Sequence, residues 1–499
     1  MKPVSYTHLS IAGHLSLGKL IVLYDSNHVT LDGPIDYSFS ENVKKRYEAM
    51  GWQVLCVDDG NDIQAILKAI KKGKKEKFKP TMIIIDTIIG YGSKNQGTSQ
   101  VHGSPLGCED GKNAKLSYGF DYDDFFVPKE VYQDFKKNIY DRGRRLYNKW
   151  NKSLKAYEEK YPDLYNELQQ AIQGNYTFDY EDLVNDFPYG LSEATRNTSE
   201  KLINAIAKQN STFLSGTADL ASSTKTVIKD GGRFSCENYT GRNLYFGIRE
   251  FAMVSIMNGI TLHKGIKVAA GGFLVFSDYF KAALRMSCLM KLPIILPLSH
   301  DSIAVGEDGP THQPIEQLAM MRSMVDIQVL RPADAYEMCA AWKIAIETKD
   351  KPTALILTRQ NVSNITKATF EDVSKGAYIV SPEKEHLDGI IIASGSEVEL
   401  AIKAKNELLE KGHDVRVVSM PSMELFNQQS DEYKESVLPH SMRKRLGIEM
   451  GIDFGWHKYI GLDGKIISVN QFGTSAPANI VIPNYGFTVE NVVNTFLNM

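Results

Sequence analysis

Short, strongly apolar runs recur along this chain, and they constrain its fold more than any other feature. Each is five or six residues long and rich in Ile, Leu or Val. Runs that are apolar on both faces predict strands buried inside parallel sheets rather than half-exposed strands. The six runs are Lys19–Tyr24, Thr81–Asp86, Pro293–Leu298, Ala354–Thr358, Gly389–Ala393 and Asp414–Ser419.

The segments between these runs have apolar positions at helical spacing. Strands that alternate with helices in this way predict an α/β fold built from doubly wound parallel sheets. A length of 499 residues corresponds to about three domains. The predicted helices include Asp62–Lys72, Ser199–Gln209, Ala333–Thr348 and Glu397–Lys411.

Two changes in composition indicate where these domains meet. Residues Lys129–Phe178 are rich in Lys, Tyr, Glu and Asn and lack strand-like runs, which predicts a helical connector. Around Ser363–Ser381 the chain turns polar before a new strand–helix series begins at Gly389. We therefore expect domains at residues 1–180, 181–370 and 371–499.

Charge and cysteine content exclude several kinds of partner. The formal net charge of -3 gives no general attraction to nucleic acid or to an anionic membrane. The basic run Lys71–Lys79 is typical of a solvated helix end, and no apolar run is long enough to cross a bilayer. Five scattered cysteines without a C-x-x-C pair fit a reducing cytosol. We expect a cytoplasmic protein that binds neither nucleic acid nor membranes.

The densest group of reactive side chains lies in Ser299–Pro314, directly after a predicted strand. Loops at the carboxyl ends of parallel strands are where open α/β sheets bind ligands. Crowding of titratable groups there favours proton transfer and oxyanion binding over packing, although a charged surface loop is the alternative. The loop contains His300, Asp301, Glu307, Asp308 and His312.

Two further clusters have both a functional and a structural interpretation. Glu250, in the segment Gly247–Met253, could be a site carboxylate or simply an acidic residue at a helix N-terminus. The aromatic side chains of Phe273–Tyr279 could line a planar cofactor or belong to the core. Arg359 and Arg196 could bind phosphate through their planar guanidinium groups, or could be surface cations.

The N-terminal part contributes two loops that follow predicted strands. Tyr24–Val29 offers oxygen ligands suited to a hard cation such as Mg²⁺. Gly90–Gly107 is glycine-rich and contains His102, a weak signal that also fits a flexible connection.

Taken together, these segments resemble transketolase along essentially the whole chain. The most specific are HDSIAVGEDGPTHQP, LTRQN, GIREFAM, TADL and VHGSPLG. The resemblance implies a first domain for the diphosphate and metal of thiamine diphosphate, a second for its pyrimidine, and a third outside the site. It also implies a homodimer with active sites between its subunits. The implied reaction is reversible transfer of a two-carbon ketol unit, for example from xylulose 5-phosphate to ribose 5-phosphate, in the pentose phosphate pathway.

The resemblance also implies cofactor contacts. Glu250 corresponds to the glutamate beside pyrimidine N1′, which promotes the tautomer that forms the thiazolium ylid. Asp219 corresponds to an aspartate on the thiazolium side, and His102 to a histidine near the diphosphate and the reacting substrate. Asn27 and the Val29 carbonyl correspond to ligands of Mg²⁺ or Ca²⁺. The aromatic pocket around the pyrimidine corresponds to Phe273, Phe276 and Tyr279.

Substrate contacts follow from the same resemblance. His312 and Asp308 correspond to residues near C1 and C2 of the sugar, where His312 has a catalytic role. The sugar-phosphate binders correspond to Arg196, Ser223, His300 and Arg359.

One departure concerns the beginning of the sequence. The family carries a G-D-G motif, with a metal aspartate, ahead of the segment matched here by LSIAGHLSLGKL, and the resemblance starts near Leu9. We therefore expect an N-terminally truncated chain with a foreign stretch at Met1–His8, an incomplete first domain and weak cofactor binding.

Several alternatives remain open. Another thiamine-diphosphate enzyme, such as a deoxyxylulose-phosphate synthase, a phosphoketolase or a 2-oxo acid dehydrogenase β chain, would share part of the pattern. His300 together with Arg359 and the complete EDGPTHQP context favours transketolase. A further alternative is an inactive remnant that can only dimerise.

Overall fold

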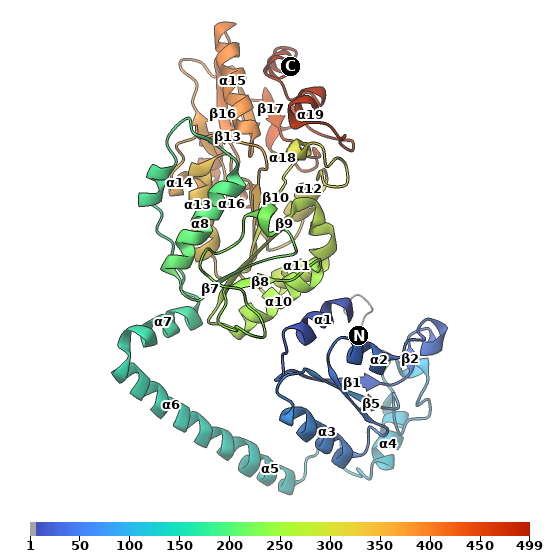
Figure 1. Ribbon diagram of the computed structural model, residues 1–499. Coiled ribbons are helices and arrows are strands. Elements are labelled where there is room, and N and C mark those ends of the chain that lie inside the picture. Colours follow the sequence, from blue (N-terminus) through green and yellow to red (C-terminus); the bar gives the residue numbers. More distant parts are fainter. Residues whose placement is uncertain (1–5) are drawn as a thin grey trace. The chain divides into compact units, whose positions relative to one another are not determined.

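The computed structural model describes residues 6–499, and the chain divides into two compact units (Figure 1). The first comprises Met1–Pro162 with Ser235–Glu237, and the second comprises Asp163–Phe234 with Asn238–Met499. Part of the stretch expected to be foreign, Met1–Ser5, lies outside the described residues. Within the described part, no helix has the length and apolar character needed to span a bilayer.

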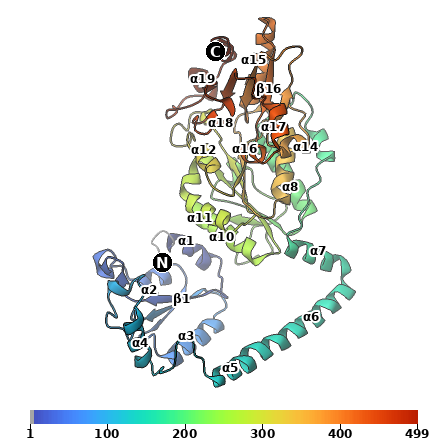
Figure 2. The ribbon, with the colours of Figure 1, turned by 180° about the vertical axis from the view of Figure 1, so that it is seen from behind.

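The first unit contains a three-stranded parallel sheet in the order β1-β5-β4. Its strands are β1 (Ile21–Ser26), β4 (Gln53–Val57) and β5 (Thr81–Asp86), and β2 (Val29–Thr30) and β3 (Gly33–Pro34) form a separate antiparallel pair. Its helices are α1 (Tyr6–His14), α2 (Val43–Ala49), α3 (Ile63–Lys75) and α4 (Cys108–Ser117), seen from both sides in Figures 1 and 2.

Helix α3 shows how the sequence defines its own ends. The Asp62 side chain accepts a hydrogen bond from the Ala65 backbone N–H at 2.9 Å, which caps the N-terminus. Three lysines stand in the last turn, where positive charge complements the helix dipole. The basic run Lys71–Lys79 is thus the end of a helix.

Burial of β1 differs from the prediction. The run Lys19–Tyr24 does form a strand, but none of the residues of β1 is fully buried, and Leu23 is 54% exposed. The central strand β5 is largely buried. The prediction of a buried strand is wrong for β1, because among residues 6–499 this strand pairs with β5 alone and lies at the edge of its sheet.

The connector predicted for Lys129–Phe178 is helical. It contains α5 (Lys129–Phe135), a π-helical turn at Lys136–Asp141, α6 (Arg142–Lys160) and α7 (Pro162–Gln173). Pro162 is the first residue of α7, a position where its fixed φ and its missing N–H cost nothing.

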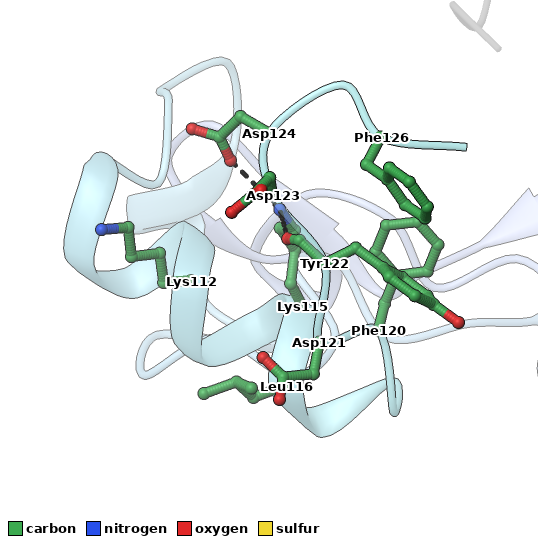
Figure 3. Close-up of a pocket in the computed structure, with 9 residues that line it drawn as sticks. All are labelled: Lys112, Lys115, Leu116, Phe120, Asp121, Tyr122, Asp123, Asp124 and Phe126. Carbon is green, nitrogen blue, oxygen red and sulfur yellow. Dashed lines mark hydrogen bonds and ion pairs between the residues drawn. The ribbon is translucent and has the colours of Figure 1, made fainter. Parts of the chain in front are cut away.

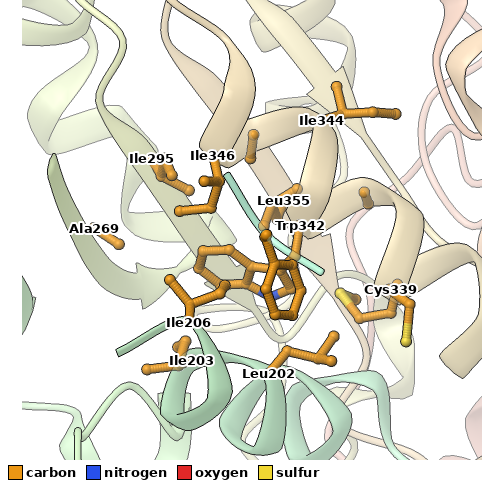
Figure 4. Close-up of a cluster of buried hydrophobic side chains, with 14 of the residues drawn as sticks. Leu202, Ile203, Ile206, Ala269, Ile295, Cys339, Trp342, Ile344, Ile346 and Leu355 are labelled. Atoms are coloured by element: carbon orange, nitrogen blue, oxygen red, sulfur yellow. The ribbon is translucent and has the colours of Figure 1, made fainter. Parts of the chain in front are cut away.

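The first sheet of the second unit has six parallel strands in the order β11-β12-β10-β9-β7-β8. Trp342 is completely buried among apolar side chains (Figure 4). It joins two helices of this sheet by donating from Nε1 to the Ser199 hydroxyl at 2.9 Å. The strands are β7 (Phe213–Thr217), β8 (Asn243–Tyr245), β9 (Lys267–Phe273), β10 (Ile295–Ser299), β11 (Gln328–Leu330) and β12 (Thr353–Leu357). The helices are α8 (Thr195–Gln209), α9 (Ala221–Thr224), α10 (Glu250–His263), α11 (Ser277–Leu289), α12 (Gln317–Arg322) and α13 (Ala335–Glu347).

A five-stranded sheet completes the second unit, in the order β14-β16-β15-β17-β18. Its edge strand β14 is antiparallel to β16, and the other pairs are parallel, so this sheet is mixed. The strands are β14 (Tyr378–Ser381), β15 (Gly389–Ala393), β16 (Val415–Ser419), β17 (Arg445–Ile448) and β18 (Lys465–Ile467). The helices are α14 (Phe370–Ser374), α15 (Glu397–Glu410), α16 (Met423–Asn427), α17 (Asp431–Val437), α18 (His457–Ile460), α19 (Ala478–Asn484) and α20 (Val489–Leu497). A short pair of strands, β6 (Ser192–Glu193) and β13 (Val362–Ser363), is antiparallel.

The predicted α/β class is confirmed. All six apolar runs contain strands, and the four predicted helices are α3, α8, α13 and α15.

Candidate active site

The predicted site residues of the second unit gather where its six-stranded sheet ends. His300 directly follows β10, Arg359 lies just after β12, and Asp219 just after β7. Because the strands are parallel, their carboxyl ends lie along one edge of the sheet. Arg196 is in the first turn of α8.

His300 is buried and sits in a strained conformation. The residue is only 3% exposed, and its backbone φ of 64° lies in the left-handed region. The ring packs against Phe273 with centroids 3.7 Å apart, and Nδ1 lies 2.9 Å from the Ser299 hydroxyl. A strained buried histidine at a strand end is typical of a functional position.

Burial, and then the neighbouring Arg196, Arg359 and His312, together lower the pKa of His300 to about 3. The imidazole is therefore neutral at neutral pH. The two arginines and His312 are thus close enough to His300 for their charges to disfavour a proton on its ring.

The two arginines are held by backbone carbonyls. Arg196 Nη1 donates to the Ser223 carbonyl at 3.0 Å, and Arg359 Nη1 donates to the Val305 carbonyl at 2.9 Å. Burial, and then the charge of Arg359, lower the pKa of Arg196. Neither guanidinium forms an ion pair with a carboxylate in the described part of the chain, where Arg196 Nε is also buried without a hydrogen-bond partner. An anion would satisfy both the charges and this donor.

An aromatic platform lies next to His300. The rings of Phe273 and Phe276 are stacked at 5.7 Å with an interplanar angle of 19°, and His312 meets the Phe276 ring edge-on at 5.6 Å. Phe273 is buried, whereas Tyr279, 6.1 Å from Phe276, is 67% exposed. Phe273 therefore belongs to the core, which is one of the two interpretations of the sequence. Tyr279 instead is an exposed ring.

The loop after β10 separates its reactive side chains into two groups. His312 is half-buried, with Nδ1 2.9 Å from the Thr311 hydroxyl, and Asp308 is exposed. Asp301 instead is buried, and its carboxylate accepts from Arg331 at 2.7 Å. The sequence pattern groups Asp301 with the reactive residues, but in the structure Asp301 forms a buried ion pair with Arg331.

Three further predicted residues of this unit are less buried than His300 or contact its cluster only through the backbone. Glu250 is half-buried as the first residue of α10, Asp219 is exposed with a left-handed φ of 66°, and Ser223 touches Arg196 through its carbonyl. Within residues 6–499, neither Glu250 nor Asp219 joins the His300 cluster through a hydrogen bond or ion pair.

The remaining predicted residues lie in the first unit. Asn27 Oδ1 accepts from the Val29 backbone N–H at 3.2 Å. Val29 lies opposite Pro34 in the β2–β3 pair, where the flanking Ile35 N–H donates to the His28 carbonyl at 2.9 Å. Val29 and Pro34 thus form a non-hydrogen-bonded pair, and the Val29 carbonyl points away from the partner strand. His102 is half-buried at the end of a short 3₁₀ turn. The described residues contain no group of three or more His, Cys, Asp or Glu side chains arranged to hold a metal ion.

A pocket in the first unit involves none of the predicted residues (Figure 3). It lies beside α4, where Lys115 Nζ donates to the Tyr122 carbonyl at 3.0 Å and to Asp124 at 3.1 Å. Of the two lysines that line it, Lys112 and Lys115, the second thus already has partners.

Comparison with known proteins decides the family. Three family models match in order: the transketolase thiamine diphosphate binding domain over residues 1–177, the transketolase pyrimidine binding domain over 192–364, and the transketolase-like C-terminal domain over 376–488. The chain belongs to the transketolase family. The match begins at residue 1, although we expected the resemblance to begin near Leu9.

Individual relatives agree along the whole chain. The transketolase of Bacillus subtilis strain 168 is 50% identical over 500 residues, which cover 99% of this chain and 75% of the relative. The structure of transketolase from Leishmania mexicana superposes with a TM-score of 0.95 at 38% identity, covering 100% of this chain and 74% of that one. A structure of Pichia stipitis transketolase in complex with sedoheptulose 7-phosphate has a TM-score of 0.94 at 39% identity, with the same coverage.

The transketolase family uses thiamine diphosphate and a divalent metal, and this chain has the same cofactors. The residues of the second unit fit the cofactor's pyrimidine ring. Phe276 is half-buried and offers an apolar ring backed by the buried Phe273, and Glu250 offers a carboxylate at a helix start.

The sequence patterns do not indicate the buried charged side chains that support this site. Arg331, Glu397 and Glu449 are fully buried charges that carry no motif, and only their burial in the folded structure distinguishes them from surface charges.

Proposed function

We propose that this chain transfers a two-carbon ketol unit from xylulose 5-phosphate to ribose 5-phosphate, reversibly, with Arg196, Arg359 and His300 binding the sugar phosphate. The observation that carries the proposal is the pair of guanidinium groups without carboxylate partners, one of them with a buried unsatisfied Nε, in the described residues. The complex of Pichia stipitis transketolase with sedoheptulose 7-phosphate supports a phosphorylated sugar as ligand.

The neutral state of His300 suits this role. A neutral imidazole beside two arginines adds no further repulsion to the free site, and its one ring N–H can donate a hydrogen bond to a phosphate oxygen. The Ser223 backbone, through its carbonyl, orients Arg196 toward the same ligand.

We assign the reaction chemistry to a second set of residues. The bound cofactor supplies a carbon nucleophile that accepts the two-carbon unit. Glu250 holds a proton at the pyrimidine N1′ position, and His312 moves a proton at the sugar oxygens near C1 and C2, where Asp308 also binds. His102, in the first unit, acts near the diphosphate and the reacting carbon.

The remaining cofactor contacts follow from the same family pattern. Phe273, Phe276 and Tyr279 bind the pyrimidine ring, and Asp219 lies on the thiazolium side. Asn27 and the Val29 carbonyl, which points away from β3, hold the metal, Mg²⁺ or Ca²⁺. We also propose domains at residues 1–180, 181–370 and 371–499, a homodimer with its active sites between subunits, and a cytoplasmic location in the pentose phosphate pathway.

The test is a coupled ketol-transfer assay with xylulose 5-phosphate and ribose 5-phosphate, in the presence of thiamine diphosphate and Mg²⁺. We expect turnover that disappears when either sugar is omitted. Turnover with pyruvate and glyceraldehyde 3-phosphate instead would favour a deoxyxylulose-phosphate synthase. A dimer that binds neither sugar would favour the inactive remnant.

A further inference from the structure

The loop that carries His312 and Asp308 rests on a segment of the C-terminal sheet domain far away in sequence. The amide nitrogen of Gln313 lies 3.1 Å from the Ile303 carbonyl, 3.1 Å from the Gly306 carbonyl and 3.0 Å from the Thr474 carbonyl. The Ser475 hydroxyl donates to the Glu307 carbonyl. One buried side chain thus closes the loop on itself and ties it to Thr474.

The approach of the two segments requires glycine. A Cβ on Gly473 would stand 1.8 Å from Gln313 Oε1 and 2.8 Å from Gln313 Cδ. Gln313 is only 2% exposed, and its three hydrogen-bond contacts prevent it from moving aside freely. A Cβ on Gly309, whose φ is 72°, would in turn meet Ser475 Cβ at 3.0 Å.

Packing joins the loop to the C-terminal domain as well. Ile303 and Ile315, at either end of the loop, belong to the same buried cluster as Val481 of α19 and Phe487. Ile315 also accepts a hydrogen bond from the Ile452 N–H through its carbonyl at 3.0 Å. The loop after β10 therefore packs with the five-stranded sheet although it begins in the six-stranded one.

A buried ion cluster fixes the start of the loop in the same way. Arg331 Nη2 donates to Asp301 at 2.7 Å, and the other side of its guanidinium binds Glu397 of α15. Glu449, after β17, accepts from Arg322 at 2.7 and 2.9 Å. Asp301 follows His300 directly. Glu397 of the C-terminal domain is therefore linked to the site through only two side chains, those of Arg331 and Asp301.

The phosphate-binding arginine depends on this loop. Arg359 Nη1 donates to the Val305 carbonyl, in the turn between Ile303 and Gly306. A shift of the loop therefore displaces the guanidinium of Arg359 together with His312.

We propose that Gln313, Gly473 and Ser475 are positioning residues for the sugar-phosphate substrate: the C-terminal domain shapes the loop that presents His312 and Asp308 and that orients Arg359. This inference rests on the proposed function. The C-terminal domain then sets the conformation of the active-site loop, so it contributes to substrate binding as well as to the folded mass of the protein.

The decisive variant is Gly473→Ala in the full chain, which forces Gln313 to give up its hydrogen bonds. The matched control is Gly389→Ala, whose Cβ would meet the Phe496 side chain at 2.5 Å and the Lys444 carbonyl oxygen at 3.0 Å, with no loop residue among these nearest contacts. We expect Gly473→Ala to raise KM for xylulose 5-phosphate roughly tenfold or more, because small misplacements of binding groups have large kinetic effects. Gly389→Ala should lower the melting temperature without this change in KM.

Milder variants keep the test informative if Gly473→Ala does not fold. Ser475→Ala removes one hydrogen bond to Glu307, and we expect a rise in KM of a few-fold at an unchanged melting temperature. Gln313→Met keeps the volume but not the hydrogen bonds, and should resemble Gly473→Ala. Equal KM values in wild type, Ser475→Ala and Gln313→Met would overturn the inference.

A binding measurement separates this inference from the proposed function. Titration calorimetry with inorganic phosphate reports on Arg359 without turnover. Weaker phosphate binding in Gly473→Ala but not in Gly389→Ala supports the inference even if the wild-type chain shows no ketol transfer. Normal ketol transfer by the wild type, with phosphate affinity and KM unaltered in Gly473→Ala, rejects the inference and leaves the proposed function intact.

Discussion

The two sheets that contain predicted site residues differ in how they are buried, although their strands look alike in sequence. All five residues of β10 in the six-stranded sheet are buried, whereas none of β1 in the three-stranded sheet is. Both strands come from short runs rich in Ile and Leu. Apolar character thus determines that a run forms a strand, and the number of strands and helices around it determines its burial.

The same difference extends to the loops. The loop after β10 is held by Gln313, by buried Ile303 and by the ion pair of Asp301. In the first unit, Asn27 and His102 are half-buried on short turns with few partners. A site group in the second unit is therefore preorganised by its surroundings to a greater degree than one in the first.

The largest expected effect is the loss of core packing. Trp342→Ala removes a completely buried ring and its bond to Ser199, which should cost about 3–5 kcal/mol of unfolding free energy. We expect calorimetry to resolve two transitions, with the first unit melting at the lower temperature and Trp342→Ala affecting the higher one. Trp52→Ala, in the first unit, is the control and should affect the lower transition. A single transition that both variants shift equally would contradict the comparison.

The next effect is catalytic. Glu250→Gln keeps the shape of the side chain but removes the proton, and general acid–base groups typically contribute roughly 100-fold or more to rate. We expect kcat to fall by at least that factor with KM little changed, in steady-state assays at saturating cofactor. An unchanged kcat would remove Glu250 from the reaction.

A smaller effect is expected for the phosphate site. Arg359→Ala removes a charge-assisted hydrogen bond worth roughly 1.5–3 kcal/mol, so KM for phosphorylated sugars should rise about ten- to a hundredfold. The informative comparison is an unphosphorylated acceptor, for which KM should change little. Equal losses with both acceptors would make Arg359 a structural residue.

The pH dependence of stability should carry the signature of His300. Its pKa is lowered to about 3 in the folded protein, whereas an exposed histidine titrates near 6.5. The unfolded chain therefore binds a proton that the folded chain excludes between these values, so stability is lost as the pH falls from about 6.5 toward 3. The slope from one proton is at most about 1.4 kcal/mol per pH unit.

His300→Asn removes this contribution. Denaturant unfolding of the second unit between pH 7 and 4.5 should give a shallower loss of stability for the variant than for the wild type. Parallel profiles would mean that His300 takes up its proton at the same pH in the folded and unfolded chain, so that folding does not lower its pKa.

The smallest effect should come from the exposed strand. Leu23→Thr, at a position 54% exposed in β1, should change stability by no more than about 0.5 kcal/mol. Leu298→Ala, in the equally apolar but buried β10, should cost about 2–5 kcal/mol. Similar costs at the two positions, measured by denaturant unfolding, would show that β1 is buried in solution.

Much of the fold can be predicted from the sequence because its signals are local. The strand runs, the helix predicted over Asp62–Lys72 and the helical connector each depend on neighbouring residues, and the structure confirms them. The strand-end positions of His300 and Arg359 follow from the same patterns. Their gathering around one point also follows, because parallel strands end at one edge of a sheet.

Contacts between segments that are distant in the chain could not be predicted from the sequence. The exposure of β1, the antiparallel direction of β14 and the buried ion pair of Asp301 each depend on which elements become neighbours. Gln313 and Gly473 are separated by 160 residues yet meet within van der Waals distance, as the contact of Gln313 with the adjacent Thr474 records. The sequence by itself determined the elements, the family motifs and the chemistry they carry. Only the tertiary structure decided which charges are buried, which rings stack and which glycines must stay small, because burial and close approach are properties of the assembled chain.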